Sequence, residues 1–152
     1  MTVLLFLIFF AACCAAAATG SMFPPDDWYD ALDKPGWTPP NWLFPIAWTL
    51  LYIAMAYAGA RLAQLPENGV AMGLWALQIA LNTLWTPVFF GLKKIKGAMI
   101  AIATLWGAVV LSTLVFFSMD PISGWLFVPY ALWVSYAAAL NFDILRRNPA
   151  IA

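Results

Sequence analysis

The chain has 152 residues, of which 64% are hydrophobic and 9% are charged, and its formal net charge is zero. A soluble domain is about one-quarter charged, so this composition excludes an ordinary soluble enzyme and predicts an integral membrane protein. The sequence has no histidine, the commonest general base and metal ligand, and no basic excess for a nucleic-acid backbone. We therefore expect a lipid bilayer as partner, with no nucleic acid, no catalytic residue and no metal site.

The first apolar run, residues 2–19, predicts a membrane-spanning helix. It lacks the basic start of a signal peptide, although Ala15–Ala18 resembles a cleavage segment and Phe10–Cys13 weakly resembles a lipidation signal. We expect the run to be retained, because its loss would remove one wall of the bundle. Cys13 and Cys14 are adjacent, so a bridge between them would be strained and both are expected to be small apolar fillers.

The next segment, residues 20–43, is stiff and aromatic, unlike a flexible linker. Its centre reads WYDALDKPGWTPP, from Trp28 to Pro40. Proline fixes the backbone angle φ, and tryptophan offers a large flat surface with one N–H group. The segment therefore predicts a structured lid over something flat. The aspartates that begin at Asp26 are expected to stabilise the start of a short helical turn.

The rest of the chain holds further apolar runs of about 20 residues, the length that crosses the hydrocarbon core. They are residues 44–65, 70–90, 97–117 and 123–145. Turn residues separate them, and no soluble domain or internal repeat is visible. The predicted fold is an all-α membrane protein: a single transmembrane domain over residues 1–152, built as a five-helix bundle with a structured first loop.

Lysine and arginine are unevenly divided between the two predicted sides of the membrane. Only Arg61 lies on the side of the N-terminus. The other side carries Lys34, Lys93, Lys94, Lys96, Arg146 and Arg147. Because basic loops face the cytosol, we expect the N-terminus outside, with the first loop and the C-terminus on the positive, cytosol-like side of a bacterial membrane.

One face of the third run carries both amides and aromatic rings. The residues recur at spacings of three and four and are Trp75, Gln78, Asn82, Trp85 and Phe89. A side-chain amide in hydrocarbon must find a partner, so this face is expected to point into the bundle. Two interpretations remain open: hydrogen bonding between helices, or a pocket wall whose amides meet a polar ligand group.

Prolines inside two of the spans, and aromatic residues near the loop side, suggest a cavity. Pro87 and Pro129 lie inside predicted spans and bend them, which either opens a cavity or is merely tolerated. Trp48 and Trp133 are expected at similar depths on different helices. Ala137 lies one turn beyond Trp133 and would leave a slot for a flat molecule.

These motifs resemble the tryptophan-rich sensory protein/translocator protein family, which includes the mitochondrial peripheral-type benzodiazepine receptor. The matching segments are WYDALDKPGWTPP, NTLWTPVFF from Asn82, VPYALW from Val128 and LNF from Leu140, in that order over almost the whole chain. The resemblance implies a bacterial member: a five-helix bundle, often a homodimer, whose first loop closes a pocket.

The resemblance also implies a receptor or sensor for porphyrins such as protoporphyrin IX, and for isoquinoline or benzodiazepine-type ligands, with no obligatory cofactor. By motif, the ligand-binding positions are Tyr29, Trp37, Phe44, Trp48, Tyr52, Asn82, Thr86, Phe89, Phe90, Trp133, Ala137 and Leu140. Lys34, or the indole N–H groups of the loop, would meet porphyrin carboxylates. Without histidine, a porphyrin would be held by shape and stacking.

One departure and two alternatives accompany this interpretation. Phe142 stands where the family's sterol-recognition segment has tyrosine, so specific sterol binding is not expected. Light-dependent porphyrin degradation is one alternative, with chemistry supplied by ligand, light and tryptophan, which leaves enzyme activity undecided. Transport of porphyrin or sterol-like molecules is the other, disfavoured because no intramembrane charge marks a path.

Overall fold

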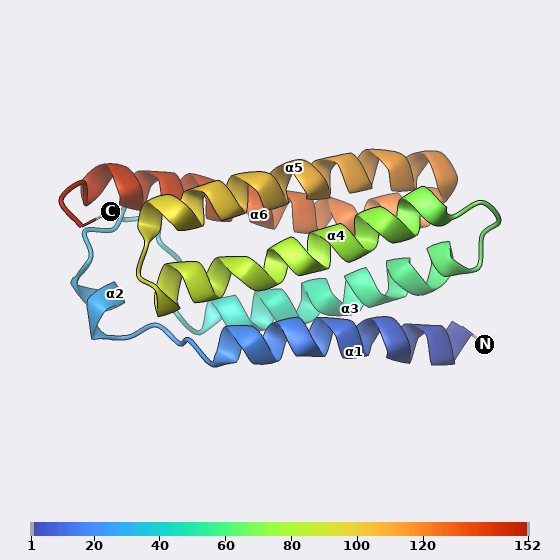
Figure 1. Ribbon diagram of the computed structural model, residues 1–152, viewed down its shortest axis with the longest axis horizontal. Coiled ribbons are helices and arrows are strands. Elements are labelled where there is room, and N and C mark those ends of the chain that lie inside the picture. The colour runs from blue at the N-terminus through green and yellow to red at the C-terminus, as the bar shows by residue number, and fades with distance from the viewer. Residues whose placement is uncertain (1, 152) are drawn as a thin grey trace.

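The computed structural model describes residues 2–151, and the regular secondary structure in this range is all helical. Long helices lie side by side as an elongated bundle (Figure 1). They are α1 (Thr2–Ser21), α3 (Leu43–Ala63), α4 (Gly69–Thr86), α5 (Ile95–Met119) and α6 (Pro121–Arg147). A short helix, α2 (Asp27–Ala31), and a π-helical turn, η1 (Pro87–Gly91), lie at one end. The predicted all-α class is confirmed.

Within residues 2–151, four helices are long and apolar enough to cross a membrane: α1, α3, α5 and α6. The remaining long helix, α4, is not among these four and carries the side-chain amides Gln78 and Asn82. The expectation of a membrane protein is therefore supported, whereas hydropathy alone does not confirm the predicted count of five spans.

The third predicted span, residues 70–90, divides into α4 and η1. Pro87 has no amide hydrogen, so the regular helical hydrogen bonding cannot continue through it. The chain winds into a wider turn instead, in which the Leu92 amide donates to the Pro87 carbonyl at 2.8 Å. Gly91 closes this turn tightly against the first loop, since a Cβ there would lie 2.8 Å from the ring of Phe23.

The end of the bundle away from α2 is tightly packed. Gly59 on α3 lets α1 approach closely, because a Cβ at this position would lie 2.6 Å from the ring of Phe9. Phe9 in turn meets the edge of Trp75, at 4.7 Å between ring centres. The Trp75 indole donates to the Met55 carbonyl at 3.0 Å, which satisfies its polar group inside the core.

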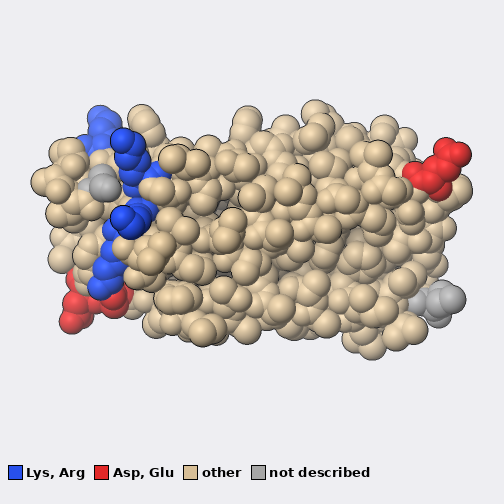
Figure 2. All heavy atoms as spheres, in the orientation of Figure 1, with Lys and Arg blue, Asp and Glu red and all other residues tan. Residues whose placement is uncertain are grey.

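On the face shown in Figure 2, charged side chains gather at the ends of the bundle and leave its middle uncharged. The lysines, Arg146 and Arg147 lie at the end that holds α2. At the opposite end, Arg61 of α3 donates to both carboxylate oxygens of Asp120, at 2.7 and 3.0 Å. Ser123 donates to the same carboxylate at 2.6 Å. The hydrogen bond from Arg61 lowers the pKa of Asp120 to about 2.

Candidate functional site

A cavity of about 460 Å³ lies between α1, α3, α4 and α5 at the end that holds α2. This volume is within the range of about 300–1,000 Å³ that is usual for small-molecule sites. The aromatic part of its wall consists of Phe23, Phe44, Trp48, Tyr52, Trp85 and Phe90. Flat apolar surfaces therefore dominate, and a few polar groups lie between them.

Asn82 is the central polar group of the cavity wall. It accepts a hydrogen bond from the Tyr52 hydroxyl at 3.0 Å and donates to the Tyr130 hydroxyl at 2.8 Å. These two hydrogen bonds join α3, α4 and α6 inside the bundle. Both sequence interpretations therefore apply to Asn82, which links helices and also borders the cavity. Gln78 is fully buried as expected, but it does not border the cavity, and its amide has no hydrogen-bond partner among residues 2–151.

Trp85 is held in place by α6. Its indole donates to the Asn141 side-chain oxygen at 2.9 Å, and the Asn141 amide donates to the Ile95 carbonyl of α5 at 3.2 Å. The ring of Trp85 stacks on Phe89, at 5.2 Å between centres. The inward face of the third span is thus confirmed, and its rings are positioned by contacts with two other helices.

A second void, of about 20 Å³, lies beside the cavity. Phe44, Trp85 and Phe90 border both spaces and therefore form the partition between them. The predicted site residues divide across this partition. Phe44, Trp48, Tyr52, Asn82, Thr86 and Phe90 border the cavity. Tyr29, Phe89, Ala137 and Leu140 border the small void.

Two predicted site residues border neither space. Trp133 lies one layer behind the wall, at 5.9 Å from Phe44 and 6.4 Å from Trp48 between ring centres. Its indole N–H is buried and has no acceptor among residues 2–151. Trp37 is 46% exposed and packs against Tyr136, whose hydroxyl donates to the Trp37 carbonyl. In this conformation Trp37 fastens the loop to α6.

The first loop begins with a capped turn. Asp26 accepts a hydrogen bond from the Tyr29 amide at 3.2 Å, as expected for an N-terminal cap of α2. This bond lowers the pKa of the Asp26 carboxyl. The side chain of Tyr29 is only 3% exposed and packs on Phe89 and Phe90, so burial raises the pKa of its hydroxyl.

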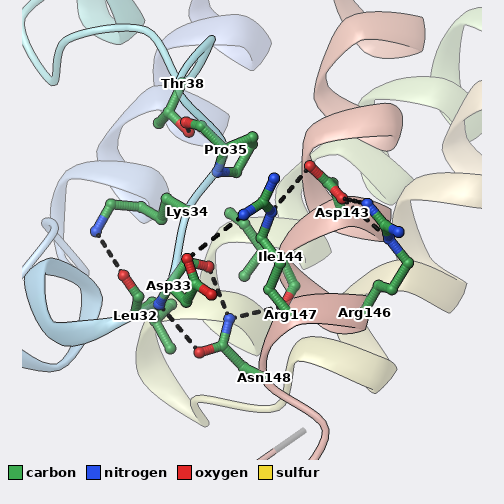
Figure 3. Close-up of polar contacts among 10 residues, drawn as sticks. All are labelled: Leu32, Asp33, Lys34, Pro35, Thr38, Asp143, Ile144, Arg146, Arg147 and Asn148. Atoms are coloured by element: carbon green, nitrogen blue, oxygen red, sulfur yellow. Dashed lines mark hydrogen bonds and ion pairs between the residues drawn. The ribbon is translucent and has the colours of Figure 1, made fainter.

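The loop is also fastened to the end of α6 (Figure 3). Asn148 accepts from the Asp33 amide at 3.0 Å and donates to the Asp33 carbonyl at 2.9 Å. Arg147 adds an ion pair with Asp33 at 3.6 Å. The Lys34 ammonium lies 2.6 Å from the Tyr29 carbonyl oxygen and over the Tyr29 ring, so in this conformation Lys34 holds the loop together.

Sequence reasoning missed the contribution of α1 and the segments beside it. The cavity is also bordered by Ala16, Ala17, Gly20, Ser21, Phe23, Pro24, Pro25 and Asn41. These side chains are mostly small, and α1 is apolar all round, so its periodicity does not mark an inner face. The one available signal was the cluster of small residues at the end of this helix.

A family model described as the TspO/MBR family matches residues 6–147. The chain belongs to this family. Protein CrtK of Rhodobacter capsulatus is 50% identical to it, with 98% of this chain and 96% of the relative covered. The tryptophan-rich sensory protein of Cereibacter sphaeroides is 49% identical over 95% of this chain and 91% of the relative. The human translocator protein is 33% identical over 80% of this chain and 75% of the relative.

Membership of the TspO/MBR family confirms the resemblance seen in the sequence motifs. It agrees with the apolar helices in making the chain an integral membrane protein of a family that contains sensory and translocator proteins. The matched residues span α1 to α6, so the cavity and the loop beside it lie within the family region.

Proposed function

We propose that the chain is a membrane receptor that binds tetrapyrroles such as protoporphyrin IX, and isoquinoline or benzodiazepine-type ligands, in the cavity beside the first loop. The observation that carries the proposal is the cavity itself, which has the volume of a ligand site and aromatic rings on its wall. Apolar macrocycles and fused rings gain most from such flat surfaces. The name of the relative from Cereibacter sphaeroides, a sensory protein, is consistent with a receptor.

The residues present suit a porphyrin held by stacking. Trp48 and Trp85 offer ring faces or edges at the cavity, and Asn82 offers a side-chain amide between them. With no histidine in the chain, no imidazole would bind a central iron. Porphyrin carboxylates would remain at the more polar margin formed by Asn41 and Ser21.

The membrane arrangement is part of the same proposal. Helix α4 has 18 residues and so a length of about 27 Å, enough to serve as a fifth span. Its amides Gln78 and Asn82 are buried, which leaves an apolar outer surface. The basic end with the first loop and the C-terminus would face the cytosol of a bacterial cell, with the N-terminus outside. Ala76 and Ala80 are exposed on α4 and would permit the close approach of a homodimer.

Titration with protoporphyrin IX tests the receptor. Exchanging both Trp48 and Trp133 for alanine removes one ring of the wall and the ring that supports it, and we expect the dissociation constant to rise by at least about tenfold. The measurement is quenching of tryptophan fluorescence, checked by the porphyrin absorbance. Trp125→Ala is the control, because this exposed ring packs on Phe117 and does not border the cavity. Unchanged affinity in the double variant would contradict the proposed site.

Light-dependent porphyrin breakdown is a second candidate, favoured by one contact. Trp48 borders the cavity, stacks on Tyr52 at 5.6 Å and lies beside Trp133, so electron-rich rings would adjoin an excited porphyrin. Illumination of the complex should then destroy the porphyrin faster than in detergent alone and give a defined product. Equal bleaching with and without the protein would remove this candidate and leave the receptor.

A further inference from the structure

Among residues 2–151, the exposed residues that line the cavity lie on one side of the bundle. Its lining residues on α4 and α5 are all buried or half-buried. Exposed lining residues come from α1, from α3 and from the two ends of the first loop, which contribute Pro24, Pro25 and Asn41. The mouth of the cavity is therefore on the side of α1 and α3.

The end of α1 presents two neighbouring rows of residues to the cavity. Ala16 and Gly20 form the inner row and are buried or half-buried. Ala17 and Ser21 form the outer row, and both are exposed although they border the same cavity. Residues four apart lie above one another on a helix, so each row follows the helix axis.

The start of α3 repeats this arrangement. Phe44 and Trp48 form its inner row and are half-buried, whereas Pro45 and Thr49 form an exposed outer row. An inner and an outer row on each of two helices is the pattern of a slot that leads outward between them. The side chains on both sides of the slot are uncharged, and those on α1 are small, so the slot is compatible with contact to lipid.

The part of the first loop around α2, by contrast, is closed over the bundle. Tyr29 is buried against η1, and the loop is joined to α6 by the paired hydrogen bonds of Asp33 and Asn148. Tyr29 borders the small void rather than the cavity, so the partition of Phe44, Trp85 and Phe90 separates α2 from the larger space.

We propose that the slot between α1 and α3 is a lateral portal, through which the ligand enters from the bilayer rather than from water beneath the first loop. This inference rests on the proposed function. It specifies an amphipathic ligand already dissolved in the membrane, whose apolar body passes Ala17 and Thr49 while its polar end remains at the level of Ser21 and Asn41. The first loop is then a fixed cover of the cavity, and its opening is not part of binding.

The test measures association and dissociation rates of protoporphyrin IX with the full chain in lipid nanodiscs. Ala17→Phe narrows the slot and should lower both rates by about tenfold or more while the dissociation constant stays within about twofold, because a portal changes the barrier and not the bound state. Ala18→Phe is the matched control, since Ala18 is exposed on the same helix and does not border the cavity. Thr49→Phe, on the α3 side of the slot, serves as a second narrowing variant should Ala17→Phe fail to fold.

Loosening the loop gives the opposite test. Asn148→Ala removes the paired hydrogen bonds to Asp33, so entry beneath the loop would become faster, whereas the portal leaves the association rate unchanged. A normal rate in the narrowed variants, an equal loss in Ala18→Phe, or faster association in Asn148→Ala would overturn the portal. Absence of binding by the unaltered chain would instead overturn the proposed function, and the portal with it.

Discussion

The two ends of the bundle are built from the same long helices but are packed differently. At the end of Arg61 and Asp120, a bidentate ion pair ties α3 to the junction of α5 and α6, and rings such as Phe116 and Phe127 meet at 4.8 Å. At the end with the first loop, a cavity of about 460 Å³ replaces such contacts. At this end the first loop is attached to the end of α6 by the paired hydrogen bonds between Asp33 and Asn148.

This difference separates stability from binding. Every buried contact at the packed end stabilises the fold. The cavity lacks such contacts between side chains, and a bound ligand can supply them. Substitutions at the packed end should therefore change the free energy of unfolding and leave ligand affinity almost unaltered. Substitutions of residues that border the cavity should change ligand affinity and leave the free energy of unfolding almost unaltered.

The largest effect on stability is expected from Phe116→Ala. Phe116 is fully buried at the packed end, and its loss leaves a void beside Phe127, which costs about 3 kcal/mol of unfolding free energy. Thermal unfolding in detergent measures the change, and porphyrin titration should show an unaltered dissociation constant. Phe142→Ala is the control, because Phe142 is exposed. A large loss of affinity without a loss of stability would contradict the separation of the two ends.

A smaller loss of unfolding free energy, about 2 kcal/mol, is expected from Asp120→Asn, because this substitution leaves Arg61 without its charged partner. The variant also changes the response to acid. Because the pKa of Asp120 is lowered to about 2, its contribution is complete above its ordinary pKa near 4 and is lost as the pH falls toward 2. Unfolding measured from pH 6 to pH 2 should show a steeper loss in the unaltered chain than in Asp120→Asn. Parallel curves would show that the pair does not stabilise the bundle.

The smallest effect is expected from Asn148→Ala at the loop end. Two hydrogen bonds to the backbone of Asp33 are lost, in an exposed setting, so global stability should fall by less than about 1 kcal/mol. The loop itself should become more open to proteolysis between α2 and α3, while the linker between α3 and α4 at the other end is cut at the same rate as before. Unchanged cleavage of the loop would show that Asn148 does not fasten it.

Local sequence patterns predicted much of the fold. Runs of apolar residues located the long helices, and the spacing of Trp75, Gln78 and Asn82 correctly placed these side chains inside the bundle. The cap formed by Asp26 was also predicted, because a cap depends only on residues within one turn. The motif from Trp28 to Pro40 led to the correct family.

Patterns along the chain did not predict which predicted site residues share one space. Trp37 packs on Tyr136 outside the cavity, and Trp133 lies behind the wall. Lys34 has the right charge for a ligand carboxylate, yet its ammonium lies against carbonyls at the end of α2. Each of these outcomes depends on which neighbour is nearest in space.

The sequence by itself thus determined the helical class, the family and the inward face of α4, because the class and this face depend on hydropathy and periodicity within one segment and the family on short motifs. Only the tertiary structure decided that the featureless α1 forms a wall of the cavity and that Asp33 pairs with Asn148, which is 115 residues away. The physical reason is that a helix period reports which way a side chain faces, whereas a cavity forms where packed helices leave space between them.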